Sequence, residues 1–278
     1  MKCCYKFLFS LIAALHLTAG TDVQAQSPGH SPGDGGEFCG IRNSTFLSGE
    51  TITYKAYYAV ADVYFAGGEA VLNIKKEELN GHSVYHIVGT GKSNSFLDHV
   101  FKVRDRYQSY IDTATLRPYK FIRDIHEGGF KKFQSVDFIK SANTAVTTSG
   151  VFSVPPCVQD VLSTIFYARN IDFDKYHEED KIPFFMFLDD QVYSMYIRYM
   201  GKEIIKTRYG SFRAIKFKPL LLKGTIFEGG EKMTVWVSDD ANHIPLRVES
   251  PVSVGKIYAD MTQYQNLRYP LSSLVSKR

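Results

Sequence analysis

The most constraining feature of the sequence is residues 231–261, where two alternating runs flank a polar tetrapeptide and a third run follows. In residues 233–238 the side chains alternate with period two, which is typical of a β-strand with two unlike faces. Residues 239–242 (DDAN) have turn chemistry, because Asp and Asn side chains bond their own backbone. The next run alternates from Ile244, and the third contains Ile257, Ala259 and Met261. This stretch predicts consecutive antiparallel strands.

Four residues of this stretch are expected to be structural. Trp236 should be buried because of its large apolar area, although alternation groups it with Thr234 and Ser238 and puts Val235 and Val237 on the opposite face. Asp239 and Asp240 should begin an exposed turn that ends at Asn242. Pro245 has no N–H to donate to a ladder, so it should lie at a strand start or an edge.

The rest of the chain repeats the pattern, with turn signals between strand-like runs. Asn80–Gly81, Glu127–Gly129 and Asp189–Asp190 predict hairpin turns, and Gly201–Lys202 predicts a further turn. The runs cover about 51–58, 69–74, 83–88, 103–111, 119–126, 130–139, 145–154, 182–188, 192–200, 203–208, 212–218 and 225–227.

The period changes only after Pro155 and Pro156. Val158, Val161, Leu162, Ile165 and Phe166 have the spacing of one helical face, which predicts a helix over about 156–169. The predicted fold is mainly β: an antiparallel curved sheet, as an open or half barrel, with this one helix packed against it.

The start of the chain predicts export. Residues 1–25 contain two lysines, an apolar run over 7–19 and small residues before Gln26, as in a signal peptide. The run is shorter than the about 20 apolar residues that a membrane helix needs. Residues 26–37 are rich in Ser, Pro and Gly and predict a flexible leader. Residues 38–278 are expected to form a single β-rich domain without a transmembrane span.

Cys39 and Cys157 remain after removal of the signal peptide, which contains Cys3 and Cys4. An even number of cysteines in an oxidising compartment predicts a disulfide. The alternative is a pair of buried free thiols that act as small apolar side chains.

Charge and motifs exclude several classes of function. The net charge of the 278-residue chain is +4, and its Lys and Arg residues are scattered, so no nucleic-acid partner is predicted. The sequence has no zinc-protease, zinc-ribbon or nucleophile-elbow motif. His82 and His86 are better explained as solvated or hydrogen-bonded residues than as metal ligands, and Asp239–Asp240 as a turn than as a catalytic dyad. No catalytic residue, metal site or cofactor is predicted.

The aromatic content permits two interpretations. The chain has 20 Phe, 18 Tyr and one Trp, and many of them alternate along predicted strands. They could pack the core and form cross-strand pairs. They could instead line a wide apolar cavity between the curved sheet and its helix, suited to an acyl chain or another hydrophobic ligand.

Four segments resemble the exported bacterial family called domain of unknown function 3108. They are residues 49–72, 155–169, 210–219 and 233–261. The most specific parts are the tryptophan strand, Asp-Asp turn and Ile-Pro-Leu-Arg stretch at 236–247, and the Pro-Pro helix at 155–169. The family has no established activity and implies no catalytic residue. A more distant similarity to the half-barrel lipoprotein carriers of the periplasm concerns the fold alone.

Three functions are consistent with these observations. The first is a non-enzymatic protein of the periplasm or cell surface of a Gram-negative bacterium that binds a hydrophobic small molecule or a lipoprotein. The second is a structural envelope protein that engages a partner chain through a sheet edge. The third is a hydrolase whose site is not visible in one sequence.

Overall fold

The computed structural model describes residues 39–60, 63–221, 230–251 and 255–277. The predicted signal peptide (1–25), the predicted leader (26–37), Phe38 and the predicted strand at 225–227 lie outside these residues.

The described residues form one antiparallel sheet of 15 strands. Fourteen of them follow each other in the order β8-β7-β6-β5-β4-β3-β2-β1-β14-β13-β12-β11-β10-β9, and β15 pairs with β11. The strands are β1 (Thr51–Val60), β2 (Val63–Leu79), β3 (His82–Ser93), β4 (Arg104–Asp112), β5 (Pro118–Glu127), β6 (Phe130–Ile139), β7 (Thr144–Thr147), β8 (Gly150–Ser153), β9 (Lys181–Leu188), β10 (Gln191–Lys206), β11 (Gly210–Pro219), β12 (Thr234–Ser238), β13 (Pro245–Pro251), β14 (Lys256–Gln265) and β15 (Leu274–Lys277).

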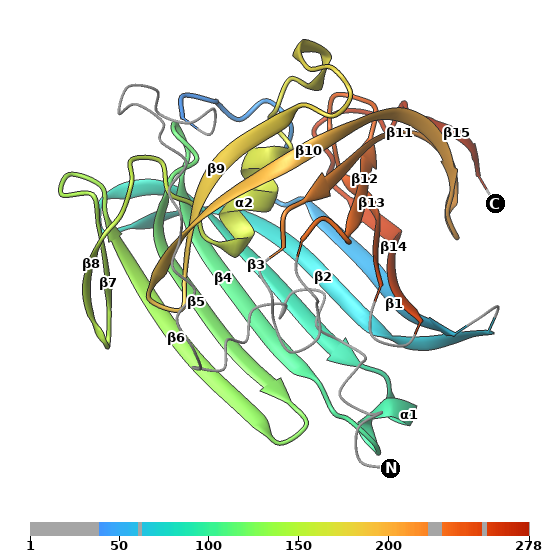
Figure 1. Ribbon diagram of the computed structural model, residues 1–278, viewed down its shortest axis with the longest axis horizontal. Helices are drawn as coiled ribbons and strands as arrows, with labels where there is room; N and C mark the ends of the chain where they lie inside the picture. Colours follow the sequence, from blue (N-terminus) through green and yellow to red (C-terminus); the bar gives the residue numbers. More distant parts are fainter. Residues whose placement is uncertain (1–38, 61–62, 222–229, 252–254, 278) are drawn as a thin grey trace.

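The sheet curves strongly but does not close into a barrel. Strands β1 to β8 form one broad layer, and β9 to β11 fold back over it (Figure 1). Helix α2 (Val161–Ala168) lies between the two parts, against β4 and β9. The predicted fold class, an open antiparallel sheet with a packed helix, is confirmed. The concave side of the sheet and α2 enclose the main hydrophobic core.

Helix α2 is shorter than the predicted helix. Asp160 is its N-cap and accepts hydrogen bonds from the backbone N–H groups of Leu162 and Ser163 at 2.8 and 2.9 Å. The preceding residues have other roles, since Cys157 has a φ of 60° and Gln159 exchanges backbone hydrogen bonds with β9. The predicted start at Pro156 was therefore wrong by five residues.

Two further helices are single turns that the sequence pattern did not predict. They are α1 (Ser95–Asp98) and the 3₁₀ helix η1 (Phe173–Lys175). Within the described ranges, no helix has the length and apolar character needed to cross a membrane.

The three predicted hairpin turns are confirmed, and the further turn predicted at Gly201–Lys202 was wrong. Asn80 and Gly81 have φ values of 51° and 79°, as a tight β-hairpin turn requires, and join β2 to β3. Glu127–Gly129 and Asp189–Asp190 join β5 to β6 and β9 to β10. At Gly201–Lys202 the chain does not turn. Strand β10 continues through a β-bulge, in which Gly201 has a φ of 83°.

Asn242 corrects the prediction that the whole turn after β12 is exposed. Its side chain is fully buried and accepts a hydrogen bond from the Tyr269 N–H at 2.9 Å. It donates to the carbonyl oxygen of Tyr269 at 3.1 Å. The turn therefore anchors the chain segment that precedes β15.

Cys39 and Cys157 form the predicted disulfide, with Cα atoms 5.5 Å apart. It joins the first described residue to the segment that leads into α2. The Ile41 N–H also donates to the Tyr167 hydroxyl at 3.3 Å, and the Ser44 N–H to Asn170 Oδ1 at 2.7 Å. These contacts hold residues 39–50 against α2 and its flanking residues.

Two carboxyl groups lie buried at one end of the concave side. Asp105 on β4 and Glu127 on β5 hydrogen-bond to each other, and the His126 N–H donates to Asp105 Oδ1 at 3.0 Å. Burial raises the pKa of both carboxyls, and the charge of Asp105 raises the pKa of Glu127 further. Burial also raises the pKa of Asp160 to about 6.

The disulfide yields the first prediction, for a chain that begins at Gln26. It closes a loop with a sequence separation of 118, so replacing both cysteines by serine should lower the free energy of unfolding by about 2–5 kcal/mol. Chemical denaturation with and without reductant measures the difference. Reductant should not change the stability of the double variant. Two free thiols in the unfolded, unreduced parent protein would contradict the disulfide.

The buried carboxyls yield the second prediction. Their pKa values are higher in the folded than in the unfolded chain, so their stabilisation is present at acid pH and is lost as the pH rises above about 4. The melting temperature of Glu127→Gln should therefore fall less than that of the parent between about pH 5 and about pH 8. His243, whose pKa burial lowers, acts in the opposite sense in both proteins. Equal slopes for Glu127→Gln, the parent and the exposed control Glu78→Gln would overturn the prediction.

Candidate functional site

An apolar cavity of about 210 Å³ lies between α2 and the concave side of the sheet. Strands from both parts of the sheet line it, together with one side of the helix. Its walls are almost entirely carbon. They are formed by Tyr54, Ala70, Leu72, Leu162, Thr164, Ile165, Ala168, Arg169, Phe184, Ile197, Phe217, Pro219, Met233, Val235, Val237, Pro245, Val248 and Ala259.

Strand alternation explains which side chains reach the cavity. On β12, Val235 and Val237 line it, two positions apart. On the paired strands β13 and β14, the register partners Val248 and Ala259 line it together. The helix contributes Leu162 and Ile165, three positions apart on one side. The same periodicities that predicted the elements therefore build the cavity wall.

The hydroxyl group of Tyr54 is the most unusual polar group at the cavity. Tyr54 lies on β1 with 6% of its surface exposed, and among the described residues its hydroxyl has no hydrogen-bond partner. Burial raises its pKa far above the ordinary value, so the group remains a neutral donor. An unpaired buried hydroxyl costs about 1–3 kcal/mol, which a ligand atom that accepts its hydrogen bond would offset.

The charged group among the described lining residues, Arg169, is already neutralised. Arg169, the C-cap of α2, forms a bidentate ion pair with Glu50, with nitrogen–oxygen distances of 2.5 and 3.0 Å. Arg169 and Glu50 are 2% and 1% exposed. The cavity therefore offers one free donor, Tyr54, and no unpaired cation among its described lining residues.

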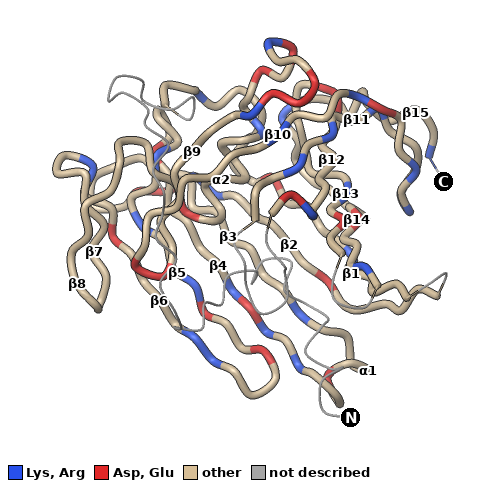
Figure 2. The backbone as a smooth tube through the Cα atoms, in the orientation of Figure 1, with Lys and Arg blue, Asp and Glu red and all other residues tan. Residues whose placement is uncertain are grey.

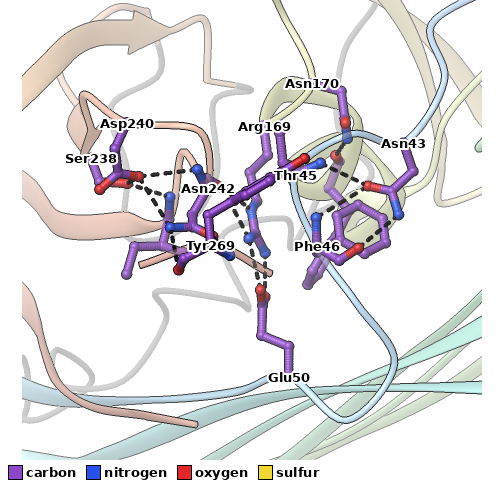
Figure 3. Close-up of polar contacts among 12 residues, drawn as sticks. Asn43, Thr45, Phe46, Glu50, Arg169, Asn170, Ser238, Asp240, Asn242 and Tyr269 are labelled. Carbon is purple, nitrogen blue, oxygen red and sulfur yellow. Dashed lines mark hydrogen bonds and ion pairs between the residues drawn. The ribbon is translucent and has the colours of Figure 1, made fainter. Parts of the chain in front are cut away.

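Arg169 also holds the turn after β12 (Figure 3). Its Nε and Nη2 atoms donate to the carbonyl oxygen of Asn242 at 3.2 and 3.0 Å. The His243 Nδ1–H donates to the carbonyl oxygen of Arg169 at 2.7 Å. These contacts join α2, the start of β1 and the β12–β13 turn. Sequence reasoning missed both Arg169 and Glu50, because no local pattern indicates a contact across 119 residues.

Three of the predicted structural residues lie around the β12–β13 turn. Asp239 pairs with Lys202 at 3.0 Å. Asp240 Oδ1 accepts hydrogen bonds from the Ser238 hydroxyl at 2.9 Å and the Asn242 N–H at 3.0 Å. Pro245 begins β13 and lines the cavity. The two aspartates therefore support the turn and do not line the cavity.

Trp236 is buried at 9% exposure but does not line the cavity. Its indole N–H donates to Glu203 Oε1 at 2.6 Å, and Lys216 Nζ lies 5.8 Å from its ring centre. Its neighbours Val235 and Val237 face the cavity, so β12 is covered on both sides. The two faces of β12 remain unlike, since one lines the apolar cavity and the other carries Trp236 with its polar and charged neighbours.

Residues with metal or acid–base chemistry do not gather at the cavity. Across the described parts of the chain, no group of three or more His, Cys, Asp and Glu residues is placed to hold a metal ion. His86 stacks on Tyr110 at 4.1 Å and hydrogen-bonds Gln108, whereas His82 stacks on Tyr119 at 4.7 Å. The predicted disulfide cysteines, Cys39 and Cys157, lie beyond the cavity wall.

A solved structure supports the fold. A β-barrel-like protein of domain of unknown function DUF1849 from Brucella abortus matches with a TM-score of 0.54 and 7% identity, over 82% of this chain and 99% of that one. This likeness shows a shared fold and nothing further. The comparison with curated proteins found no significant match.

Two other structures match with TM-scores too low to support a structural conclusion. A candidate exported protein with a YmcC-like fold from Bacteroides fragilis has a TM-score of 0.34 and 14% identity, over 81% of this chain and 99% of that one. A candidate lipoprotein from Parabacteroides distasonis has a TM-score of 0.36 and 15% identity, over 81% and 100%.

The sequence itself matches a family model over residues 53–262, which extends from the first strand to β14 and includes every residue of the cavity wall. This match confirms the resemblance found in the sequence. The chain belongs to the family described as Protein of unknown function (DUF3108).

Proposed function

We propose that this protein is an exported, non-enzymatic β-protein of the periplasm or cell surface that binds an elongated apolar ligand between α2 and the concave side of the sheet. The observation that carries the proposal is the cavity of about 210 Å³, with carbon-rich walls and a Tyr54 hydroxyl that has no hydrogen-bond partner among the described residues. Binding sites for small hydrophobic molecules combine such apolar walls with a few placed polar groups.

The polar groups favour a particular class of ligand. An apolar chain would gain about 0.8 kcal/mol for each methylene group buried. Its polar end would meet Tyr54 as a neutral donor, while Glu50 already neutralises Arg169. An acyl ester or another uncharged hydrogen-bond acceptor therefore fits better than a free carboxylate, whose charge would lack a partner in the cavity.

Export is supported by the sequence and by the disulfide. Residues 1–25 have the pattern of a signal peptide, and the Cys39–Cys157 bond is typical of oxidising compartments. The non-enzymatic character rests on the absence of a catalytic motif from the sequence and on the apolar nature of the cavity.

A structural role through a sheet edge is the second candidate. Strand β8 ends the strand order, and its Val151 is 68% exposed. An unpaired edge with an exposed apolar residue can accept a strand from a partner. The other end of the order is less open, because Gln159 bonds to the backbone of β9.

The hydrolase alternative has weaker support. Asp105 and Glu127 are close and have raised pKa values, as catalytic acids often do. Neither residue lines the apolar cavity, however, and Glu127 lines no other described cavity.

The third prediction tests the cavity by filling it. Ala70 on β2 lines the cavity and is half-buried, so Ala70→Phe should occupy space that the ligand needs. Binding of the fluorescent probe N-phenyl-1-naphthylamine, and its displacement by 1-decanoylglycerol, should weaken by at least about tenfold. Ala114→Phe, in an exposed turn, should bind like the parent. Unchanged binding by a folded Ala70→Phe protein would rule out this cavity as the site.

The fourth prediction tests whether the Tyr54 hydroxyl binds the polar end of the ligand. Tyr54→Phe should bind 1-decanoylglycerol about fivefold more weakly, since one neutral hydrogen bond contributes about 1 kcal/mol. It should bind N-phenyl-1-naphthylamine as the parent does, because that probe needs only the apolar wall. A loss of both ligands would indicate a packing effect, and a loss of neither would remove Tyr54 from the site.

The fifth prediction concerns export. The protein recovered outside the cytoplasm should begin at Gln26, after cleavage behind Ala25. Intact-mass measurement gives the answer directly. Retention of residues 1–25 on the exported chain would contradict the proposal.

A further inference from the structure

A second cavity, of about 430 Å³, lies on the opposite side of strands β1, β13 and β14. Its walls come from Tyr57, Arg247, Tyr258 and Asp260 on these strands. They alternate with Tyr54, Val248 and Ala259, which line the apolar cavity. The two cavities are therefore separated by the thickness of one sheet.

The β10–β11 turn closes one side of this second cavity. Lys206, at the end of β10, and Arg208, in the turn, line it together with Thr207. Figure 2 shows basic residues at the ends of β10 and β15 and on β13. An adjoining cavity of about 370 Å³ shares Lys206 and Thr207 and adds Lys277. We call the first of these cavities, with its lining residues, the aromatic groove.

The charges of the aromatic groove do not balance. Arg247 forms a bidentate ion pair with Asp260, with distances of 2.6 and 2.7 Å. Within the described part of the chain, neither Lys206 nor Arg208 has a carboxylate within ion-pair distance. Arg208 instead lies over the ring of Tyr57, with its central carbon 3.9 Å from the ring centre. Two cations of the groove therefore remain available to an anion.

The remaining wall consists of tyrosine rings. Tyr64 and Tyr258 have ring centres 5.9 Å apart, and Tyr64 is 55% exposed. Burial raises the pKa of Tyr57 and Tyr258, so both hydroxyls stay protonated at neutral pH. Such rings offer a flat apolar surface and a hydrogen-bonding hydroxyl to a polar ring compound.

We propose that the aromatic groove binds a phosphate ester of a sugar, with the phosphate at Lys206 and Arg208 and the sugar ring against Tyr57, Tyr64 and Tyr258. Arg and Lys are the side chains that recognise phosphate most strongly. The groove is open and carries net positive charge, which favours a charged polar ligand over the apolar ligand of the first cavity. The phosphate could belong to a soluble sugar phosphate or to a membrane glycolipid, and the two sources share this chemistry.

The test measures binding of glucose 1-phosphate by calorimetry at low salt. The double variant Lys206→Gln/Arg208→Gln should bind at least tenfold more weakly than the parent. The double variant Lys131→Gln/Lys175→Gln removes the same charge from exposed positions on β6 and η1, outside the groove, and should bind like the parent. Tyr64→Ala should weaken glucose 1-phosphate binding with no change in fold, as checked by circular dichroism.

A second arm identifies the source of the phosphate, using vesicles of phosphatidylcholine with and without a phosphorylated glycolipid such as lipid A. Groove-dependent binding to the lipid A vesicles without binding of glucose 1-phosphate would assign the site to the membrane lipid. Binding of glucose 1-phosphate assigns it to the soluble ester. Equal binding of uncharged glucose, an equal loss in both double variants, or no binding in either arm would overturn the proposal. Ala70→Phe should leave all of these results unchanged, so the outcome is independent of the apolar cavity.

Discussion

The buried ion pair between Arg169 and Glu50 is the interaction on which the arrangement of the core depends. It joins the end of α2 to the residue before β1, and Arg169 also binds the carbonyl oxygen of Asn242 in the β12–β13 turn. Three segments far apart in the chain thereby meet at one guanidinium group. Removing one partner of such a pair typically costs about 3–5 kcal/mol, because the other charge stays buried. The pair, together with the Cys39–Cys157 bond, holds α2 at both ends above the concave side of the sheet.

Holding α2 in this position is what leaves room for the apolar cavity. A helix packed flat on the sheet would fill the space with its own side chains. Here residues 39–50, which precede β1, support α2 and its flanking residues through polar and covalent contacts, and small residues such as Ala70, Ala168 and Ala259 form part of the wall. The ion pair also neutralises the charge of Arg169, so Tyr54 is left as the free polar group among the described residues that line the cavity. The specificity that we propose for the cavity thus follows from a contact whose main role is structural.

The fold could be predicted from the sequence because it depends on local patterns. Period-two alternation located most strands, and Asn80–Gly81 located a hairpin, since both turn residues need positive φ. The helix start was missed because Val158, which precedes the N-cap Asp160, fits the helical period by chance. Gly201 was predicted to form a turn, but a glycine with positive φ is equally suited to a β-bulge, which is where it lies. The site was harder to predict from the sequence than the fold. Tyr54 could be placed on a strand, but the lack of a described partner for its hydroxyl and the Arg169–Glu50 contact depend on the folded chain.

The aromatic groove and the apolar cavity share the strands β1, β13 and β14 as a common wall, with neighbouring residues such as Tyr258 and Ala259 serving opposite sides. Their chemistry is therefore tied to the parity of residue positions along each strand. A deletion or insertion of a single residue within β14 would turn Tyr258 and Asp260 toward the apolar cavity. It would turn Ala259 toward the aromatic groove. We expect these strands to accept length changes only in pairs of residues or where a bulge restores the alternation.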